Sequence, residues 1–416
     1  MPELASRSYL TDIAALAVVS PGPIAGPQMR DVPIIADAAL LIENGRIAWF
    51  GARRDAPAVG DAQRISCVGG LVVPGLIDCH THIPFAGERS GEFVRRVAGE
   101  SYLSIMQSGG GIRVTTDAVR LASEQQLVDE NLPRLQRMLS HGVTTVECKS
   151  GYGLSPEAEL KQLRATRALA SLTPQDLIPT YLGAHALPRE FDGCPDEFLD
   201  VIGDAALFDR IAREKLARFC DVFCDRGAFD VPQSRRYLER AAAAGLRLKL
   251  HADELAQIGA SRLAGELAAV SADHLEHLDD AGIAAMLRSG TIAVVLPGTS
   301  FFLGIPHADA RRMISAGLPV ALATDCNPGS AMIESLPLVM NIACCQLRMT
   351  PAEVLTACTA NAAAAIGEQR RIGAIAIGFD ADLLVLDCPT LERWFYDVGR
   401  NRVQAVFKTG RSANRE

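Results

Sequence analysis

The sequence lacks three features that would each have set its class: paired cysteines, a basic stretch and a long apolar run. Its 416 residues include eleven cysteines, an odd number without a CxxC pair. This excludes a zinc ribbon and indicates reduced, mostly buried thiols in a cytoplasmic protein. The apolar run Ile13–Val19 has no basic flank and is too short for a bilayer. We therefore expect neither a membrane span nor a secretory leader.

Positive charge is also scarce. The chain has 41 Lys and Arg against 49 Asp and Glu, a net charge of −8. Without a basic stripe interleaved with aromatic residues, nucleic acid is not an expected partner. The pairs Arg95-Arg96 and Arg235-Arg236 are interpreted as solvated helix or loop faces. Hydrophobic residues make up 49% of the chain, which is enough for a large core and too much for a disordered protein.

The middle of the chain alternates apolar runs with helical patterns. This alternation, with runs apolar on both faces, predicts an α/β fold with parallel strands, and eight runs favour a closed (β/α)8 TIM barrel. Apolar residues at Val128, Leu132, Leu135 and Leu139 predict one helix, and Ser155-Pro156 predicts the capped start of another. The eight runs are Leu71–Asp78, Thr144–Cys148, Ile178–Leu182, Val222–Cys224, Leu246–Leu250, Ala272–Leu275, Thr291–Leu296 and Val320–Thr324.

The two ends of the chain have a different pattern, with short strands and turns. Asn44-Gly45 between two apolar runs predicts a tight β-hairpin. Neither end has enough strands to close a core alone. We therefore expect residues 1–73 and 376–416 to combine in one small composite β-sandwich domain, with residues 74–375 forming the barrel.

Histidines gather where the predicted barrel strands end. The active site of such a barrel lies at the carboxyl ends of its strands. Of the eight histidines in the chain, five occupy these positions: His80, His82, His185, His251 and His274. Random placement would have scattered them over helices and loops.

Four of the strand-end residues predict a metal site. Residues two apart on a strand point the same way, so His80 and His82 can reach one ion. His251 is a third candidate, and Asp325 follows the eighth strand. Taken singly, they could be loop histidines, a structural histidine and a helix-capping acid. Taken together, they suit Zn²⁺ or Fe²⁺ with one open position.

Further polar residues near these ends are candidates for binding and catalysis. His274 is either a structural histidine or a group that stabilises a developing oxyanion, and the second is favoured. Glu254 is either a helix-start acid or a partner for a substrate N–H or the attacking water. Arg89 is either a surface residue or a clamp for a carboxylate. Glu147, Lys149 and Lys249 could form a buried ion network, to which we assign no function.

These residues carry a resemblance to a known family. His80-Thr81-His82 after Pro74-Gly75-Leu76-Ile77-Asp78, with His251, His274 and Asp325, resembles the amidohydrolase superfamily over nearly the whole chain. Four longer motifs resemble, within it, the ring-opening hydrolases of histidine degradation. The motifs are Gly99-Glu100-Ser101-Tyr102 through Gly109-Gly110-Gly111-Ile112, Glu147-Cys148-Lys149-Ser150-Gly151-Tyr152-Gly153, Lys249-Leu250-His251-Ala252-Asp253-Glu254, and Ala323-Thr324-Asp325-Cys326-Asn327-Pro328-Gly329-Ser330.

The resemblance implies particular roles for these residues. The implied metal ligands are His80, His82, His251 and Asp325, and the implied catalytic groups are Asp325, His274 and Glu254. Many two-metal members carry a carboxylated lysine on the fourth strand, and residues 219–225 contain none, which implies a single ion, Zn²⁺ or Fe²⁺. The implied substrate contacts are Arg89, Tyr152, His185, Glu254, Asn327, Gly329 and Ser330.

The resemblance also implies an activity. A metal-activated water would attack the ring carbonyl of 4-imidazolone-5-propanoate and yield N-formimidoyl-L-glutamate, in a protein expected to be a cytoplasmic homodimer. One alternative is a deaminase of the same superfamily acting on guanine, cytosine or a related ring. Another is a catalytically inactive relative serving as a binding scaffold. The second is disfavoured because none of the four ligands is missing.

Overall fold

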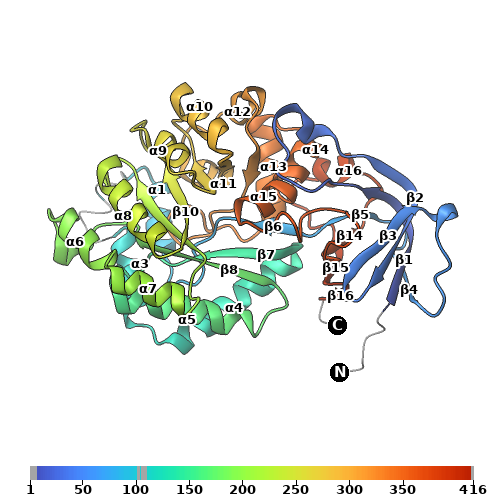
Figure 1. The fold of residues 1–416 in the computed structure, drawn as a ribbon, viewed down its shortest axis with the longest axis horizontal. Coiled ribbons are helices and arrows are strands. Elements are labelled where there is room, and N and C mark those ends of the chain that lie inside the picture. Colours follow the sequence, from blue (N-terminus) through green and yellow to red (C-terminus); the bar gives the residue numbers. More distant parts are fainter. Residues whose placement is uncertain (1–6, 101–103, 105–109, 414–416) are drawn as a thin grey trace.

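Two sheets of eight strands organise the fold, one built from the middle of the chain and one from its two ends (Figure 1). The structure is a computed structural model that describes residues 7–100, 104 and 110–413. Ser101, Tyr102 and Gly109 of the first long motif therefore lie outside the described residues. Within the described part of the chain, no helix is both long enough and apolar enough to span a membrane.

The middle of the chain forms the predicted (β/α)8 barrel. Each strand pairs in parallel with the next along the chain. A parallel bridge between Thr81 and Cys326 joins the first strand segment to the last. Each of the eight predicted runs overlaps one strand of the barrel: β6 Leu76–Asp78, β7 Val143–Lys149, β8 Asp176–Ala184, β9 Phe219–Cys224, β10 Arg247–Ala252, β11 Ser271–His274, β12 Ile292–Val295 and β13 Val320–Leu322.

One predicted strand proves to be two. The run expected over Leu71–Asp78 is divided at Gly75 into β5 (Leu71–Pro74), which belongs to the other sheet, and β6. A Cβ on Gly75 would lie 2.5 Å from Oγ1 of Thr144. Glycine therefore permits the close approach to β7 at the point where the chain passes from one sheet to the other.

The two ends of the chain meet in the second sheet. Its order is β16-β15-β14-β5-β1-β2-β3, with β4 beside β1. Asn44 and Gly45 have φ of 51° and 79° and connect β2 to β3, which confirms the predicted hairpin. The strands are β1 Arg7–Ala17, β2 Ile34–Glu43, β3 Arg46–Ala52, β4 Gln63–Ser66, β14 Leu383–Leu386, β15 Val403–Lys408 and β16 Arg411–Ser412.

This terminal sheet has a hydrophobic core of its own. Leu10 and Leu40 from the amino-terminal strands pack in one cluster with Leu383 and Phe407 from the carboxyl-terminal strands. The cluster fits the expected composite domain. We keep the division into residues 1–73 with 376–416 and residues 74–375 as a proposal.

Helices surround the barrel. Val128, Leu135 and Leu139 of α4 are buried as their spacing predicts. The helices are α1 Ser90–Val97, α3 Ile112–Leu121, α4 Glu124–Ser140, α5 Pro156–Ala170, α6 Pro195–Ile202, α7 Ala205–Arg213, α8 Val231–Ala243, α9 Ala260–Glu266, α10 Asp280–Ser289, α11 Pro297–Leu303, α12 Ala310–Ala316, α13 Leu336–Leu347, α14 Pro351–Ala357, α15 Ala360–Ala365 and α16 Leu391–Tyr396, with 3-10 turns at Gly26–Arg30, Arg53–Asp55 and Arg189–Phe191.

The start of α5 differs in detail from its prediction. The helix begins at Pro156 as expected, but the side chain of Ser155 makes no capping hydrogen bond. The carboxylate of Glu159 instead accepts hydrogen bonds from the backbone N–H groups of Gly151 and Leu154, at 2.8 and 2.7 Å. A buried acid of the helix thus holds the loop that follows β7.

The cysteines were expected to be reduced and mostly buried. All eleven are free thiols, and only Cys194 and Cys345 are exposed.

Candidate active site

The five histidines at the strand ends lie together inside the barrel mouth. The ring centroids of His80 and His251 are 4.6 Å apart, those of His251 and His274 5.1 Å, and those of His82 and His185 5.0 Å. Four of the five are buried, and His185 is partly covered. The strands run away from the terminal sheet, so the cluster lies on the side of the barrel opposite that sheet (Figure 1).

The four predicted metal ligands face one another. Oδ1 of Asp325 lies 3.2 Å from Nε2 of His82 and 3.5 Å from Nε2 of His80. Nε2 of His251 is 3.5 Å from Nε2 of His82. Ligands bound at about 2.0–2.1 Å around a tetrahedral ion are separated from one another by about 3.3–3.4 Å. Ligand atoms of His80, His82 and Asp325 all lie within 4.8 Å of one another, which fits one small divalent ion, and Nε2 of His251 lies beside this group.

The unsatisfied atoms of the cluster also fit an ion. Nε2 of His80 and Oδ1 of Asp325 are buried without a hydrogen-bond partner among the described residues. Buried polar atoms in native proteins nearly always have a partner. The two atoms lie 3.5 Å apart, and a cation between them would satisfy both.

Two buried acids lie beside two of the histidines that are predicted to bind metal. Nδ1 of His80 lies 2.6 Å from Oδ2 of Asp273, and Nδ1 of His251 lies 3.0 Å from Oδ2 of Asp221. An acid at Nδ1 keeps the proton there and leaves the lone pair of Nε2 directed into the cluster. The ring of His80 is therefore held in the tautomer that a metal ligand needs, and Asp221 lies beside the corresponding nitrogen of His251.

The predicted buried ion network lies beneath this layer. Lys149 contacts Glu147 at 3.1 Å and Asp221 at 2.8 Å, and Lys249 donates to Glu147 at 2.7 Å. Both lysines are also within 4 Å of Asp273. The two ammonium groups therefore balance the charge of the acids that orient His80 and His251.

Oδ1 of Asp325 faces Nε2 of His80 and Nε2 of His82. Its second oxygen, Oδ2, accepts a hydrogen bond of 2.7 Å from Oγ1 of Thr299. One oxygen thus faces the histidines while Thr299 fixes the other.

His274 lies between two buried glutamic acids. Its Nε2 is 3.4 Å from Glu254 and its Nδ1 is 4.0 Å from Glu276. Burial raises the pKa of Glu254 to about 7 and that of Glu276 to about 8. His274 and Leu275 have φ of 80° and 71°, a conformation that is strained for residues with side chains and that clusters at functional sites.

The tautomer of His185 is fixed by the backbone. Its Nδ1 lies 2.9 Å from the carbonyl oxygen of Gly151, which can only accept, so Nδ1 carries the proton and Nε2 does not. Burial, followed by the charge of His82, lowers the pKa of His185 to about 3. Tyr152 is buried beside it, with ring centroids 5.3 Å apart.

The loop after β13 is organised by Asn327. Its Oδ1 accepts hydrogen bonds from the backbone N–H groups of Gly329 and Ser330, both at 2.8 Å, and its Nδ2 donates to the hydroxyl of Ser330 at 2.9 Å. The carbonyl oxygen of Gly329 accepts from Nη1 of Arg96 at 3.2 Å. The structure therefore brings Asn327, Gly329 and Ser330 together as one turn, whose contact with substrate stays a prediction.

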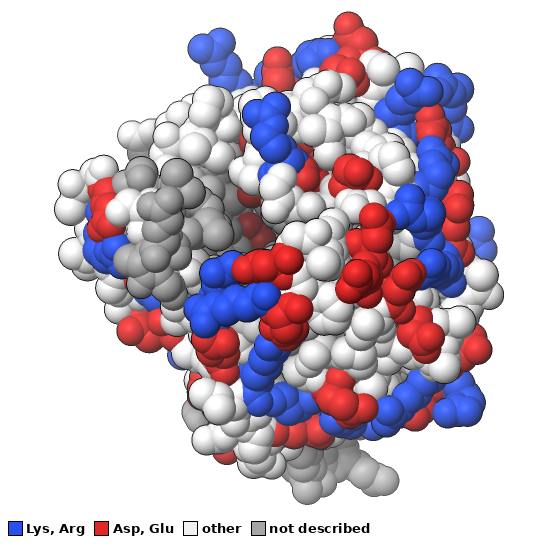
Figure 2. All heavy atoms as spheres, turned by 90° about the vertical axis from the view of Figure 1, so that its left-hand side faces the viewer, with Lys and Arg blue, Asp and Glu red and all other residues white. Residues whose placement is uncertain are grey.

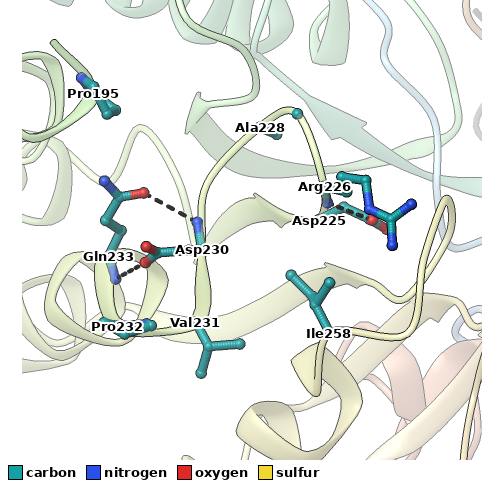
Figure 3. A pocket seen from close by; sticks show the side chains of 10 residues that line it. Pro195, Asp225, Arg226, Ala228, Asp230, Val231, Pro232, Gln233 and Ile258 are labelled. Atoms are coloured by element: carbon teal, nitrogen blue, oxygen red, sulfur yellow. Dashed lines mark hydrogen bonds between the residues drawn. The ribbon is translucent and has the colours of Figure 1, made fainter. Parts of the chain in front are cut away.

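The mouth of the barrel is hollowed at the surface. Figure 2 shows this side of the molecule, with acidic side chains in the depth of a hollow near its centre and charges of both signs around it. A separate cavity of about 560 Å³ lies beside the loop between β9 and α8 (Figure 3). Oδ2 of Asp225, one of the residues that line it, accepts hydrogen bonds from the backbone N–H groups of Glu254 and Leu255.

Several residues of the site were not identified from sequence. Asp221 and Asp273 lie inside apolar strands, and Thr299 and Glu276 lie in the loops and helices that follow. A charged residue within a strand buried on both faces is itself a signal, because such a charge needs a partner. Arg96 was interpreted as solvated, and here the structure disagrees: the side chain is half-buried against Phe302.

Known proteins resemble the chain over its length. The sequence model of the amidohydrolase family matches residues 71–413. An imidazolonepropionase of Shouchella clausii (strain KSM-K16) is 45% identical over 416 residues, 99% of this chain and 93% of the relative. One of Geobacillus kaustophilus (strain HTA426) is 47% identical over 404 residues, 96% of this chain and 95% of the relative.

Solved structures share the fold. An adenosine deaminase from Xanthomonas campestris with bound zinc has a TM-score of 0.71 at 20% identity, covering 97% of this chain and 92% of that one. A guanine deaminase from E. coli has a TM-score of 0.73 at 15% identity, covering 99% and 100%. At these identities the likeness concerns the architecture and not the substrate.

Proposed function

Because this chain belongs to the amidohydrolase family, and within it to the imidazolonepropionases, we propose that it opens the ring of 4-imidazolone-5-propanoate by hydrolysis to give N-formimidoyl-L-glutamate, a step of histidine degradation. The observation that carries this proposal is the close array of His80, His82, His251 and Asp325, with the Arg89–Gly329 contact beside the barrel mouth. The array supplies the chemistry of hydrolysis, and the contact supplies recognition of a carboxylate.

We propose that His80, His82, His251 and Asp325 hold one Zn²⁺ or Fe²⁺ ion. When bound, such an ion supplies Lewis acidity, which makes a water molecule a nucleophile near neutral pH. Three imidazoles and one carboxylate accept either metal. A single ion is proposed because β9 carries no lysine that could bridge a second one.

Asp325 is the proposed proton carrier. Its Oδ1 lies among the histidines, 3.2 Å from Nε2 of His82, where an ionised carboxylate can take the proton of the attacking water. Thr299 holds Oδ2 in place during this transfer. Asp325 then returns the proton to the ring nitrogen that leaves when the C–N bond breaks.

His274 and Glu254 are proposed to act on the reacting carbonyl from the side opposite Asp325. A donor at His274 would stabilise the negative charge that develops on the carbonyl oxygen. Glu254, with a pKa near 7, can hold or release a proton at working pH and is within 3.4 Å of His274. It can therefore bind a ring N–H or orient the water.

The remaining predicted contacts orient the substrate. The unprotonated Nε2 of His185 can accept a ring N–H, and Tyr152 lines the pocket beside it. The planar fork of Arg89 suits the propanoate carboxylate. Asn327, Gly329 and Ser330 would enclose that group in their turn.

We further propose a cytoplasmic homodimer. Eleven free cysteines fit a reducing compartment. The oligomeric state can be measured directly by light scattering of the purified protein.

The direct test of the proposed function is a substrate assay. The metal-loaded protein is incubated with 4-imidazolone-5-propanoate and formation of N-formimidoyl-L-glutamate is followed, beside parallel incubations with guanine and cytosine in which ammonia is measured. We expect the first product and no ammonia. Ammonia released from a nucleobase, without ring opening of the imidazolone, would identify a deaminase instead.

A further inference from the structure

We propose that Arg96 is a second arginine of the carboxylate subsite. It supplies positive charge to the substrate because the charge of Arg89 is already paired with Glu92. This inference rests on the proposed function, which requires a carboxylate to be bound beside the reacting ring. It assigns specificity to a residue on α1 that has no role in the reaction described above.

Arg89 already has a carboxylate partner close to it in the chain. Its Nε and Nη2 both donate to Oε2 of Glu92, at 3.0 and 2.7 Å. The other oxygen of Glu92 accepts the backbone N–H of Gly111 at 3.0 Å. Nη1 of Arg89 donates to neither oxygen of Glu92 and lies against Gly329. The charge of Arg89 is therefore largely matched before any substrate arrives.

Arg96 reaches the same glycine from further along α1. Its Nη1 donates to the carbonyl oxygen of Gly329 at 3.2 Å. Its Nη2 is shielded from solvent and has no hydrogen-bond partner among the described residues. A buried guanidinium nitrogen without an acceptor calls for an explanation, and a ligand oxygen at this position would provide one.

The surroundings keep this charge unneutralised. The guanidinium of Arg96 lies 4.8 Å from the ring centroid of Phe302 and 5.8 Å from that of Phe93. Burial, followed by the charge of Arg89, lowers the pKa of Arg96 below its ordinary value. Arg89, Arg96 and Glu92 together carry one positive charge in excess. Such a cluster suits a monoanion with two acceptor oxygens, which is a carboxylate.

The two guanidinium groups give the subsite its selectivity. Nη1 of each arginine lies at Gly329, and both guanidinium groups can only donate hydrogen bonds. An amide or methyl group in place of the carboxylate would leave donors unpaired in a partly dehydrated site. The pair therefore discriminates a ring with an acidic arm from the same ring without one.

The test separates loss of carboxylate binding from general damage. Steady-state kinetics of the metal-loaded Arg96→Met and Arg96→Lys variants are compared with wild type on 4-imidazolone-5-propanoate. We expect KM to rise about 10- to 100-fold in Arg96→Met, as for the loss of a hydrogen bond to a charged group, with kcat changed less than about threefold. Arg96→Lys, which keeps the charge without the fork, should fall between them. Arg113→Met, which removes an arginine paired with exposed Asp192, is the matched control and should leave KM unchanged.

Two competitive inhibitors make the result specific. Binding of 3-(imidazol-4-yl)propanoate should weaken in Arg96→Met by the same factor as KM rises, whereas binding of 4-methylimidazole, which lacks the carboxylate, should not change. Equal weakening of both inhibitors, or KM within twofold of wild type in both variants, would overturn the inference. If wild type failed to open the imidazolone, the proposed function would fall, and binding of the two inhibitors would still report on Arg96.

Discussion

The guanidinium of Arg89 occupies the space that a side chain at Gly329 would need. A Cβ built on Gly329 would come closer to Nη1 of Arg89 than nonbonded atoms approach one another. Glycine at this position therefore sets how far Arg89 can reach into the loop after β13. Because Gly329 has no side chain, the guanidinium of Arg89 can lie against the backbone of this loop.

Gly329→Ala should accordingly weaken substrate binding. The added methyl group displaces Arg89, so we expect KM for 4-imidazolone-5-propanoate to rise about 10-fold or more, as when a charged hydrogen bond is lost, with the unfolding midpoint shifted little. Gly91→Ala is the control, because a Cβ there meets no atom within 4 Å. Similar KM values for the two variants would show that Arg89 accommodates the methyl group.

Loss of a ligand and loss of the proton carrier should be separable. His251→Ala removes a nitrogen from the array, and we expect metal content and activity to fall together. Asp325→Asn keeps the shape of the side chain but lowers its basicity, so kcat should fall at least about 100-fold even in metal-replete protein. Metal analysis by mass spectrometry beside kcat measurements distinguishes them. Full activity in Asp325→Asn would remove Asp325 from proton transfer.

Asp221 and Asp273, which lie beside His251 and His80, should increase the affinity for the metal ion. Asp221→Asn weakens the acceptor at Nδ1 of His251 and leaves Lys149 with one acid fewer. We expect the dissociation constant of Zn²⁺, measured by competition with a chromogenic chelator, to increase about 10- to 100-fold. Asp200→Asn on the surface of α6 is the control. An unchanged affinity in Asp221→Asn would mean that packing alone orients His251.

Removal of the metal should lower thermal stability. An ion present at about 1,000 times its dissociation constant stabilises the native state by about 4 kcal/mol. Treatment with a chelator should therefore lower Tm, and addition of Zn²⁺ or Fe²⁺ should restore it. The same scan on His251→Ala should show no response to either treatment. A Tm that is indifferent to metal in wild type would contradict the proposed site.

Glu276 should make stability depend on pH. Burial raises its pKa from 4.5 to about 8, so the fold favours the protonated form. Its contribution is fully present below about pH 4.5 and is lost as the pH rises to about 8, because the unfolded chain ionises first. A tenfold change in proton affinity between the folded and unfolded chain corresponds to about 1.4 kcal/mol of stability. Glu276→Gln cannot ionise and keeps an acceptor for Ser300.

The free energy of unfolding of Glu276→Gln, measured by urea titration, should therefore gain on wild type by a few kcal/mol between about pH 5.5 and about pH 8.5. Parallel pH profiles for the two proteins would show that Glu276 is ionised in the native state.

The barrel and its ligands were predictable because both leave local signals. Strands buried on both faces appear as apolar runs, and His80, His251 and Asp325 lie at or just after the ends of three of them. The division at Gly75 was not predictable, since an apolar run does not show which sheet each half will join. That choice depends on pairing of β5 with β14, far along the chain.

The residues that surround the site could not be predicted, because their contacts join segments that are far apart in the sequence. Asp273 meets His80 and Asp221 meets His251 only once four separate strands are adjacent. Arg96 becomes half-buried because Phe302 and Gly329, more than 200 residues away, fold against it. Local patterns could indicate the ligands but not these partners.

The passage of the chain from β5 through Gly75 into β6 has a consequence for biosynthesis. β5 pairs with β1, which precedes it, and with β14, where Pro74 meets Leu383. The second of these partners is made roughly three hundred residues later, at the slow end of long-range pairing. Nearly the whole chain must therefore be synthesised before β14 can pair with β5, the strand that leads into β6 and His80. The site therefore assembles only when translation is almost complete. A chain that ends before the last strands would contain all four proposed metal ligands but would lack the strand pairing that fixes their positions.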